Sequence, residues 1–505
     1  MSEQLESVAD FYRNGHILIT GGTGFMGKLM IDKLLRSFSD IDSLYIMVRD
    51  KKGSSPEERV EKMFDSVIFN RLTKEVPNFR SKIKVIPSNI EAEHLGLSPE
   101  SKQLLISNVN IIFHCAATLR FDEELQAGVR ANLYATRQIL NLAKQCANLK
   151  LLTYVSTAFC HANIKTTTEE KIYQPKTSYR TLIDLLDLSP DDPKLNEMRV
   201  KLAKENANTY TLTKAAAEQL LSEEGKDVPV SIFRPAIVIS TWKDPVPGWI
   251  DNLYGPTGVV TGVQAGLIRT IHCNPDVTGD MVPADLTVNA LVCSAWDASN
   301  RRQQNPTSLP IYNYVSSKDN PITWFEFQDK SFSAGVKTPP AQVLMHCYRP
   351  YMTKSRTKYL FLSIFLHYLI GYVFDFFFWL SRHPMRLVPI YKKLDKALAV
   401  LQPFSSRDWY FENGNVQTAW NRLSPADQSR FPFDIRDLDW DDYLETYVRG
   451  TMVYHLRDSF EPEVRKKALA RYFRLTIIYH VLKGVLYALA AFFLWFLSRL
   501  VIGSK

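Results

Sequence analysis

An apolar run followed by three spaced glycines, HILITGGTGFMGK at residues 16–28, decides the fold. The first five of these residues predict a buried strand, and Leu29–Leu35 behind the glycines has the pattern of a helix. Gly21 allows a tight turn, Gly24 lets the backbone approach a pyrophosphate, and Gly27 lets the helix pack closely on the strand. Because the N-terminus of a helix offers free N–H groups to phosphates, we predict a dinucleotide site here. The alternative is a glycine-rich turn without a ligand.

The first 240 residues continue this alternation of short apolar runs and longer helical patterns. Such an order predicts right-handed βαβ units and an α/β fold with a doubly wound parallel sheet, covered by helices on both faces. The expected strands are His16–Thr20, Ser43–Val48, Lys82–Pro87, Asn110–His114, Leu151–Val155 and Pro229–Phe233, and the expected helices cover residues 25–37, 56–69, 122–146 and 206–224.

Beyond residue 240 the pattern changes twice. Pro and Gly cluster in Asp244–Gly248 and Tyr254–Gly262, which predicts long loops over 241–350, and loops of this kind carry substrate contacts on α/β scaffolds. From about 351 the sequence is helical, aromatic and basic. We therefore expect four parts: a Rossmann domain that binds a dinucleotide at 1–240, a substrate-binding part at 241–350, a helical domain at 351–475 and, at 476–498, a membrane anchor.

The composition excludes several classes of protein. Among the 505 residues, 46% are hydrophobic and 23% are charged, which excludes a disordered or fibrous chain. A net charge of +8 is mild for this length and does not indicate a nucleic-acid partner. Six cysteines cannot form a disulfide framework, so we expect a reducing compartment. The first ten residues lack an apolar stretch, and we expect no secretory signal.

The second predicted strand ends in a basic turn. NAD sites usually place an acid at this strand end to hold the ribose 2′-hydroxyl, but here Arg49 stands there, followed by Asp50, Lys51 and Lys52. A guanidinium can bind a 2′-phosphate bidentately, so the sequence favours NADPH over NADH. Asp50 keeps NADH open, and a solvated basic turn is the structural alternative.

Two further features accompany the fourth strand. It ends with the small residues Ala116 and Ala117, as a cofactor passing over that strand end would require. Asn132 in the following helix is placed to hold the active-site loops, although a lone Asn is more often a surface or capping residue. Cys115 and Cys160 flank strand ends, but a free Cys more often packs as a small hydrophobe than relays an acyl group.

The candidate catalytic residues follow the fifth strand. Thr157 lies at its end, and Tyr210 and Lys214 are four residues apart, so a helix places both on one face. A lysine ammonium beside a phenol is expected to lower the tyrosine pKa from about 10 and to make the phenol a proton donor to a developing oxyanion. The Thr157 hydroxyl is expected to bond the same substrate oxygen. No metal ligand set is predicted.

Several motifs together resemble one family. They are TGGTGFMGK at 20–28, IFHCAATLRF at 112–121, VSTAF at 155–159, YTLTK at 210–214, FRPAIV at 233–238 and PGWIDN at 247–252. The combination resembles the alcohol-forming fatty acyl-CoA reductases, which are extended short-chain dehydrogenases/reductases with a helical C-terminal domain. The sequence departs from many relatives at Gly22, where Ala is usual, at Phe159, where Tyr is usual, and at the third strand end, where Asn89 replaces an Asp.

The resemblance implies reduction of a long-chain acyl-CoA to a primary alcohol by two hydride transfers from NADPH, through a hemithioacetal that expels CoA. It implies that Thr157, Tyr210 and Lys214 are catalytic. The residues expected at the cofactor are Gly21, Thr23, Gly24, Phe25, Met26, Gly27, Arg49, Asn89, Ala116, Ala117, Asn132 and Pro235. The rival functions are another membrane-linked reductase of the extended type, such as a 3β-hydroxysteroid dehydrogenase, and a non-catalytic NADPH-binding scaffold.

Two apolar segments lie in the last third. Thr476–Ser498 is long enough to span a bilayer and follows six basic residues between Arg457 and Arg474, which predicts a C-terminal tail anchor with the catalytic part in the cytosol. Tyr359–Leu380 has basic residues on both sides, which favours an interfacial or buried helix over a crossing. Peroxisomal and endoplasmic reticulum membranes both accept tail anchors, so the sequence leaves the organelle open, as it does the acyl chain length and the oligomeric state.

Overall fold

The computed structural model describes residues 6–51, 53–121, 123–161, 164, 166–204, 208–341, 343 and 345–502. Its contacts divide the chain into two compact units, both built from segments distant in sequence. Unit 1 contains residues 1–250, 278–322 and 407–440, and unit 2 contains 251–277, 323–406 and 441–505. The units therefore follow contacts in space rather than the linear order of the chain, and each is described here by itself.

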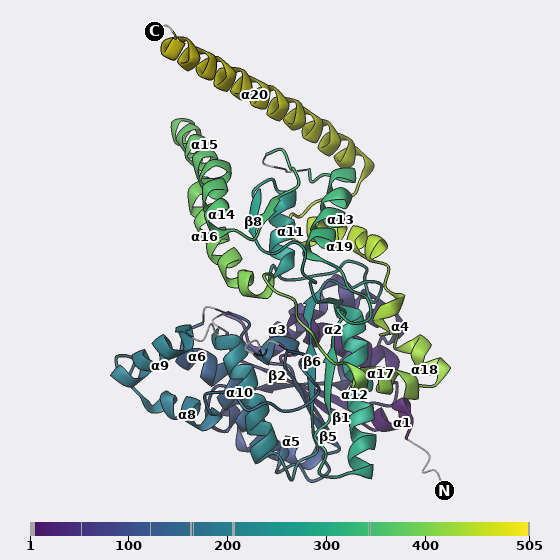
Figure 1. The fold of residues 1–505 in the computed structure, drawn as a ribbon. Helices are drawn as coiled ribbons and strands as arrows, with labels where there is room; N and C mark the ends of the chain where they lie inside the picture. Colours follow the sequence, from purple (N-terminus) through teal and green to yellow (C-terminus); the bar gives the residue numbers. More distant parts are fainter. Residues whose placement is uncertain are drawn as a thin grey trace. The chain divides into compact units, whose positions relative to one another are not determined.

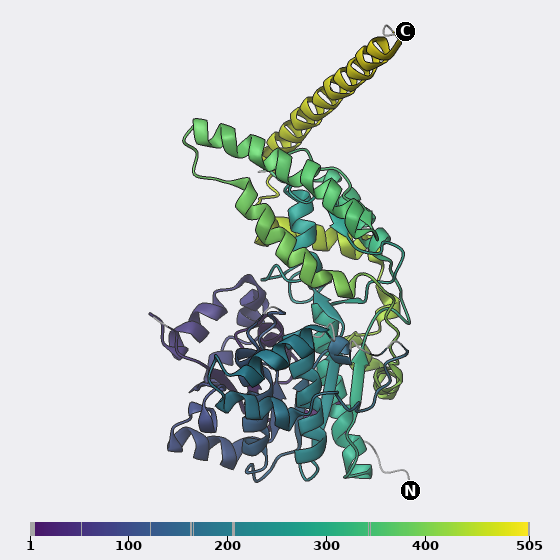
Figure 2. The ribbon, with the colours of Figure 1, turned by 60° about the vertical axis from the view of Figure 1, so that its left-hand side comes forward.

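A seven-stranded sheet of parallel strands forms the centre of unit 1, in the order β10-β6-β5-β4-β1-β2-β3. The order reverses between β1 and β4, where the two strands pair Ile17 with Ile111. Figures 1 and 2 show the strands side by side with helices against both faces. The strands are β1 His16–Thr20, β2 Ser43–Val48, β3 Ile83–Pro87, β4 Ile111–His114, β5 Leu151–Val155, β6 Val230–Pro235 and β10 Ile311–Tyr314.

Helices cover the two faces with different partners. On one face, α12 contacts α1, α2, β5 and β6, and the Tyr12 hydroxyl of α1 donates to the Val292 carbonyl of α12. On the other face, leucines and alanines of α5, α7, α8, α9 and α10 form one apolar cluster with the sheet. The bounds are α1 Val8–Tyr12, α2 Phe25–Ser37, α12 Ala284–Gln304, α5 Pro99–Asn108, α7 Ala135–Ala143, α8 Tyr179–Asp184, α9 Pro193–Lys204 and α10 Thr209–Glu224.

Shorter elements complete unit 1. A separate parallel pair joins β7 and β9. The shorter elements are α3 Pro56–Phe64, η1 Val67–Phe69, α4 Asn70–Glu75, η2 Phe79–Lys82, η3 Glu93–Gly96, α6 Leu125–Gly128, η4 Val129–Tyr134, η5 Ala158–His161, η6 Leu185–Asp187, β7 Ile237–Ile239, β9 Met281–Pro283, α17 Gly414–Arg422, α18 Pro425–Arg430 and η9 Ile435–Asp437.

The predicted doubly wound parallel sheet is confirmed, and the six expected strands are present within two residues at each end. The expected helix at 122–146 is divided by a π-helical turn at Val129–Tyr134, and Asp122, like residues 206 and 207 of the helix expected at 206–224, lies outside the described residues. The prediction of loops throughout 241–350 is wrong for Pro256–Gln264 and Trp324–Lys337, which are the helices α11 and α13 of unit 2, and for residues 284–314 of unit 1. There α12 and β10 complete the covering and the edge of the sheet, and α12 lacks a polar face because it is buried on nearly every side.

Unit 2 is helical, as predicted for the C-terminal region, apart from a short parallel pair of β8 and β11. One apolar cluster joins α11, β8, α13 and α16, and a second joins α15 to α16. The elements are α11 Pro256–Gln264, β8 Thr270–His272, α13 Trp324–Lys337, β11 Tyr351–Thr353, α14 Arg356–Ser363, η7 Ile364–Tyr368, α15 Leu369–Leu380, α16 Leu387–Leu401, η8 Gln402–Phe404, α19 Trp440–Tyr454, which starts at the edge of unit 1, and α20 Pro462–Ile502.

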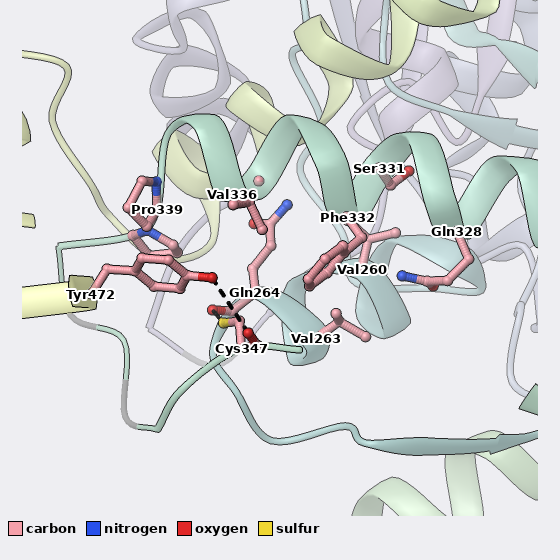
Figure 3. Close-up of a pocket in the computed structure, with 12 residues that line it drawn as sticks. Val260, Val263, Gln264, Gln328, Ser331, Phe332, Val336, Pro339, Cys347 and Tyr472 are labelled. Carbon is pink, nitrogen blue, oxygen red and sulfur yellow. Dashed lines mark hydrogen bonds between the residues drawn. The ribbon is translucent and has the colours of Figure 1, made fainter. Parts of the chain in front are cut away.

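A small cavity lies between α11 and α13 and is closed at one end by Tyr472 of α20 (Figure 3). Its volume is about 10 Å³, which is room for about one water molecule. Its walls are apolar, but the side-chain amide nitrogens of Gln264 and Gln328 and the hydroxyl of Ser331 are buried without a hydrogen-bond partner in the described structure. The cavity is therefore too small to hold a fatty acyl chain.

Candidate active site

The glycine turn has the close contacts that a dinucleotide site requires. Gly21 has a φ of +73°, a conformation that residues with a side chain rarely adopt. A Cβ atom on Gly27 would lie 2.2 Å from the Gly21 carbonyl oxygen, so the first turn of α2 packs directly on the loop. Gly24 is the exposed N-cap of α2, and Phe25, Met26 and Thr23 are half-buried around it. The free N–H groups of this helix end are thus presented at the carboxyl edge of the sheet, which is the edge at which dinucleotide-binding folds take a pyrophosphate.

Hydrogen bonds hold the neighbouring strand ends around this turn. The Thr20 hydroxyl lies 2.7 Å from His114 Nδ1 and accepts the Ala116 N–H at 3.2 Å. On its other side, His114 Nε2 lies 3.0 Å from the Thr136 hydroxyl. A Cβ on Gly21 would approach the Ala116 nitrogen to 2.8 Å. Ala116 therefore lies beside the glycine turn, and Ala117 follows it; both are half-buried.

The end of β2 presents arginine to solvent. The Arg49 side chain is 72% exposed, with one guanidinium nitrogen 3.8 Å from the Glu91 carboxylate. Arg59 of α3, which the sequence analysis did not single out, donates to the Arg49 carbonyl and adds a second guanidinium at the same place. Asn89, at the end of β3, is exposed, and its amide oxygen accepts the Glu91 N–H at 3.2 Å. Lys52 lies outside the described residues. The cationic character of this corner suits a phosphate.

Asn132 joins two loops of the site. It lies within the π-helical turn η4, its side-chain oxygen accepts the Thr118 N–H at 2.8 Å, and its amide nitrogen donates to the Thr213 hydroxyl at 3.0 Å. Thr213 directly precedes Lys214 on α10. The structure therefore shows Asn132 holding the loop after β4 against the helix that carries Tyr210 and Lys214.

Thr157, Tyr210 and Lys214 come together at the carboxyl ends of β4 and β5. Lys214 is 2% exposed, its ammonium donates to the Val155 carbonyl at 2.6 Å, and it lies 4.6 Å from the ring centre of Tyr154. Thr157 is buried two residues beyond Val155, and its hydroxyl is near enough to the Tyr210 phenol to oppose the rise in the phenol pKa. The edge of the Phe121 ring packs on Tyr210, with ring centres 5.4 Å apart.

The electrostatics of the pair differ from the sequence-based prediction. Burial is the largest influence on Tyr210 and, together with the Cys160 thiol, raises the phenol pKa above its ordinary value, against the effect of the Thr157 hydroxyl. The expectation that the Tyr210 pKa is lowered is wrong for this structure, because burial raises it and the Lys214 ammonium is bonded to the Val155 carbonyl rather than to the phenol. Burial lowers the pKa of Lys214 to about 8, although Cys115 and Glu218 oppose the shift. The phenol is therefore held in its protonated form, ready to donate.

Comparisons with known proteins agree with this site. Two family models, both described as male sterility protein, match residues 19–291 and 366–458. The chain is 36% identical to the fatty acyl-CoA reductase wat of Drosophila melanogaster, over 97% of this chain and 93% of that protein. It is 37% identical to the mouse fatty acyl-CoA reductase 1, over 91% and 88% of the two chains. The chain belongs to the fatty acyl-CoA reductase family.

Solved structures show the same fold at lower identity. The reductase domain of a nonribosomal peptide synthetase from Mycobacterium tuberculosis is 19% identical, with a TM-score of 0.58, and the match covers 90% of this chain and 93% of that one. The terminal reductase domain of the myxalamid pathway is 18% identical, with a TM-score of 0.56 and the same coverage. Both comparisons support an NAD(P)-binding reductase fold with a helical C-terminal region.

Directly beneath Lys214, this reductase buries an ion pair that the sequence analysis did not identify. Glu218 lies one turn after Lys214 on α10, and both of its carboxylate oxygens accept hydrogen bonds from Arg234 of β6, at 2.9 and 2.6 Å. The Arg234 guanidinium is wholly buried and also donates to the carbonyls of Glu169 and Lys171. The four-residue spacing from Lys214 to Glu218 was a detectable signal, but the partner strand could not be known from spacing.

His161 completes this buried cluster. Its Nε2 lies 3.0 Å from Glu218, and the Cys160 thiol lies 3.3 Å from the same carboxylate. Burial opposes ionisation of Glu218, but Arg234 and His161 outweigh it and hold the carboxyl pKa well below its ordinary value. Burial also opposes protonation of His161, yet the neighbouring Cys160 and Glu218 raise its pKa to about 10. The cluster is therefore a charged network of Arg234, Glu218 and His161.

Three of these residues have the spacing of a metal site, but the carboxylate that a metal would need is already bound by arginine. Within the described residues, Cys160, His161 and Glu218 form the one group whose ligand atoms all lie within 4.8 Å of one another. The Arg234 guanidinium, however, already bonds both oxygens of Glu218 and would repel a cation.

Two other residues predicted to lie at the cofactor are also placed by the structure. Pro235 is buried at the end of β6, and the Phe25 ring stacks on Trp249 with ring centres 5.2 Å apart.

Replacing Arg234 with Met is expected to destabilise the protein by about 3–5 kcal/mol, because it leaves Glu218 buried beside fewer positive partners. The folded-state pKa of Glu218 is depressed in the wild type, so the stability that the pair contributes is present above about pH 4.5 and lost as the pH falls. The deficit of the variant should therefore shrink on acidification. Thermal unfolding of the two purified proteins across pH measures this.

The matched control is Arg71→Met, because Arg71 is half-exposed and pairs with the exposed Glu75 and with Asp244, which keeps Arg36 as a partner. An exposed pair contributes about 1 kcal/mol or less, so this variant should unfold close to the wild type. Equal losses in the two variants would show that the buried pair has no special weight.

Proposed function

We propose that the protein reduces long-chain fatty acyl-CoA to the primary fatty alcohol, releases free CoA, and uses NADPH for both reductions in one site. The observation that carries the proposal is the convergence of Thr157, Tyr210 and Lys214 at the sheet edge beside the glycine turn. Membership of the fatty acyl-CoA reductase family supports the substrate class. It also disfavours the steroid dehydrogenase and scaffold alternatives, since neither explains a family match through residues 366–458.

The proposed NADPH site fits the residues present. We assign the pyrophosphate to the glycine turn, which contains Gly21, Thr23, Gly24, Phe25, Met26 and Gly27. We assign the 2′-phosphate to Arg49. Asn89 is assigned to the adenine, and Ala116, Ala117, Asn132 and Pro235 to the nicotinamide half of the cofactor. When bound, NADPH supplies the hydride. The closeness of Gly21 to Ala116, where a Cβ would meet backbone at 2.8 Å, supports a surface shaped for close approach.

The protein's own residues act on the substrate oxygen. The hydroxyls of Thr157 and Tyr210 bind the carbonyl oxygen and stabilise the oxyanion that develops on it. Tyr210 donates the proton that completes the alcohol, and Lys214 supplies positive charge beneath it. Cys115 takes no part as a nucleophile, because burial raises the pKa of its thiol to about 12 and a thiol, unlike a thiolate, attacks poorly.

The functional division of the chain follows from these assignments. We assign cofactor binding to residues 1–240, substrate contacts to 241–350, a helical domain to 351–475 and membrane anchoring to 476–498. In the structure α20 continues as one helix through this last segment, and most of its described large apolar side chains from Ile477 to Trp495 are half or more exposed. We propose that α20 anchors the protein in the peroxisomal or endoplasmic reticulum membrane with the catalytic part in the cytosol.

Product analysis tests the proposed reaction. Purified full-length protein, given NADPH and a series of acyl-CoA chain lengths, should oxidise two NADPH for each CoA released and yield the alcohol as main product. The reason is that the described residues place one glycine turn beside the Tyr210–Lys214 pair, so both reductions would occur in one place. One NADPH per CoA, with free aldehyde accumulating, would identify an aldehyde-forming reductase instead.

Activity should depend on pH through Lys214. Protonated Lys214 is the useful form, and its pKa is lowered to about 8, so kcat/KM should fall as the pH rises through about 8. Tyr210→Phe should lose about 100-fold or more at every pH because the proton donor is gone. Cys115→Ser and Cys160→Ser serve as controls and should keep substantial activity. An acyl group trapped on either cysteine would contradict the direct transfer.

Cofactor choice should depend on Arg49. A charge-assisted hydrogen bond to the 2′-phosphate contributes about 1.5–3 kcal/mol, so Arg49→Ala should lower kcat/KM with NADPH by roughly 10- to 100-fold. Activity with NADH should change little, because NADH has no phosphate there. Arg13→Ala, at an exposed arginine of α1's C-cap, is the control and should leave both values unchanged. Equal losses with the two cofactors would remove the phosphate role.

Protease treatment of intact organelles tests the topology. With one C-terminal anchor, added protease should digest residues 1 to about 475, because they face the cytosol. Engineered Asn-x-Thr sites between residues 400 and 450 should remain unglycosylated. Protection of the catalytic part, or glycosylation of such a site, would show that an earlier segment crosses the membrane.

A further inference from the structure

The helix formed by α14, η7 and α15 has two very different faces. It runs over Arg356–Leu380, and among the described residues it is the one helix long and apolar enough to cross a membrane. Its outer face carries eleven large apolar side chains between Leu360 and Leu380, each 47–65% exposed. A contiguous exposed apolar face of this size marks an interaction surface.

The inner face of the same helix is fastened to unit 2 by polar contacts. His367 Nε2 accepts the Arg269 backbone N–H at 3.0 Å. The Asp375 carboxylate accepts the N–H groups of Leu387 and Val388 and so caps the start of α16. Crossing the bilayer as a separate helix would break these bonds and carry a carboxylate and an imidazole into hydrocarbon, where they have no partners. The helix therefore suits a position along a membrane surface.

Close packing secures the helix to α16. A Cβ on Gly371 would lie 3.0 Å from the Tyr391 ring, so only glycine allows this approach without a shift. The ring of His367 stacks on the same Tyr391, with centres 5.0 Å apart. We call the whole element Arg356–Leu401 the hairpin. Its two helices form one packed body, and the apolar outer face belongs to that body.

The charge of the hairpin region selects the partner. Asp375 is the α16 cap and Asp395 accepts hydrogen bonds from Tyr359 and Tyr368, so both acids between residues 354 and 400 are satisfied internally. Seven basic residues of the hairpin surround them: Arg356, Lys358, Arg382, Arg386, Lys392, Lys393 and Lys396, while Lys354 just before the hairpin is paired with Asp276. This excess of five positive charges would repel a second copy of the same face and attracts an anionic surface.

We propose that the hairpin docks on the cytosolic surface of an anionic lipid membrane, with the outer face of α14–α15 inserted among the acyl chains parallel to the surface and the lysines of α16 at the headgroups. This deepens the membrane association proposed above and does not depend on the reaction. It gives the protein a second lipid contact besides α20. It also places one whole helix in contact with the lipid acyl chains, in which a long-chain substrate dissolves.

Depth-dependent fluorescence quenching on the full-length protein tests the docking. Phe361→Cys, Val373→Cys and Leu380→Cys are each labelled with an environment-sensitive fluorophore and reconstituted into phosphatidylcholine vesicles with phosphatidylserine. All three labels should be quenched about twofold or more strongly by a nitroxide near the headgroups than by one at the bilayer centre. The wild-type protein, labelled in the same way, gives the signal from native cysteines, and this signal is subtracted. Cys115 is the one native cysteine that is not fully buried. Leu104→Cys, an exposed apolar position on α5 of unit 1, is the water-exposed control.

Two results of this quenching experiment would overturn the proposal, and the lysine variants described next supply a third. Strongest quenching of position 373 by the central nitroxide, with 361 and 380 on opposite leaflets, would show that the helix spans the bilayer. Labels no better quenched than at position 104 would show that the face stays in water or is covered by protein.

The charge part has its own test. Exchanging Lys392, Lys393 and Lys396 for Gln should reduce the quenching in anionic vesicles but not in phosphatidylcholine alone. The matched triple exchange of exposed lysines in unit 1, Lys62, Lys144 and Lys226, should leave it unchanged. Equal effects of the two triple variants would be the third contrary result. Because α20 is intact throughout, failure of the docking and failure of the anchor are distinguishable.

Discussion

The buried pair of Glu218 and Arg234 is the interaction on which the arrangement of the site depends. An arginine without solvent exposure is stable only if its charge and donors are satisfied, and Arg234 meets this with one carboxylate and two backbone carbonyls. In doing so it ties strand β6 to helix α10 and to the loop around residue 170. Tyr210 and Lys214 lie on the same helix as Glu218, so the ion pair sets the height of the proposed catalytic residues over the sheet.

Burial controls the chemistry that this arrangement can perform. The same loss of water that lowers the pKa of Lys214 raises the pKa of Tyr210, so the two groups move apart in proton affinity and the phenol keeps its proton well above the pH at which Lys214 loses its own. The positive charge of Lys214 is partly balanced by the carboxylate of Glu218. Glu218 stays ionised because Arg234 and His161 bind it. A proton donor surrounded by fixed charges and excluded from water suits the protonation of an oxyanion at neutral pH.

The sequence predicted the strand–glycine turn–helix unit well because its signals are local. The strand His16–Thr20, the three glycines and the small residues after β4 are close in sequence, and backbone sterics alone explain them. Asn132 was correctly expected to hold the loops, and its bonds to Thr118 and Thr213 show how. Arg59 and Arg234 were not recognised as parts of the site, because their roles depend on elements brought together only by folding.

The sequence by itself determined the doubly wound parallel sheet, the glycine turn at its edge and the helical nature of the region after 351, since each follows from periodicity and steric demands within a short stretch. Only the tertiary structure decided that α12 and β10 return to the sheet from a region that looked like loops, because a helix buried on nearly every side has no periodic pattern. It also decided which face of Arg356–Leu380 is polar. Composition makes that segment uniformly apolar, whereas His367 and Asp375 bond to partners that lie elsewhere in the chain.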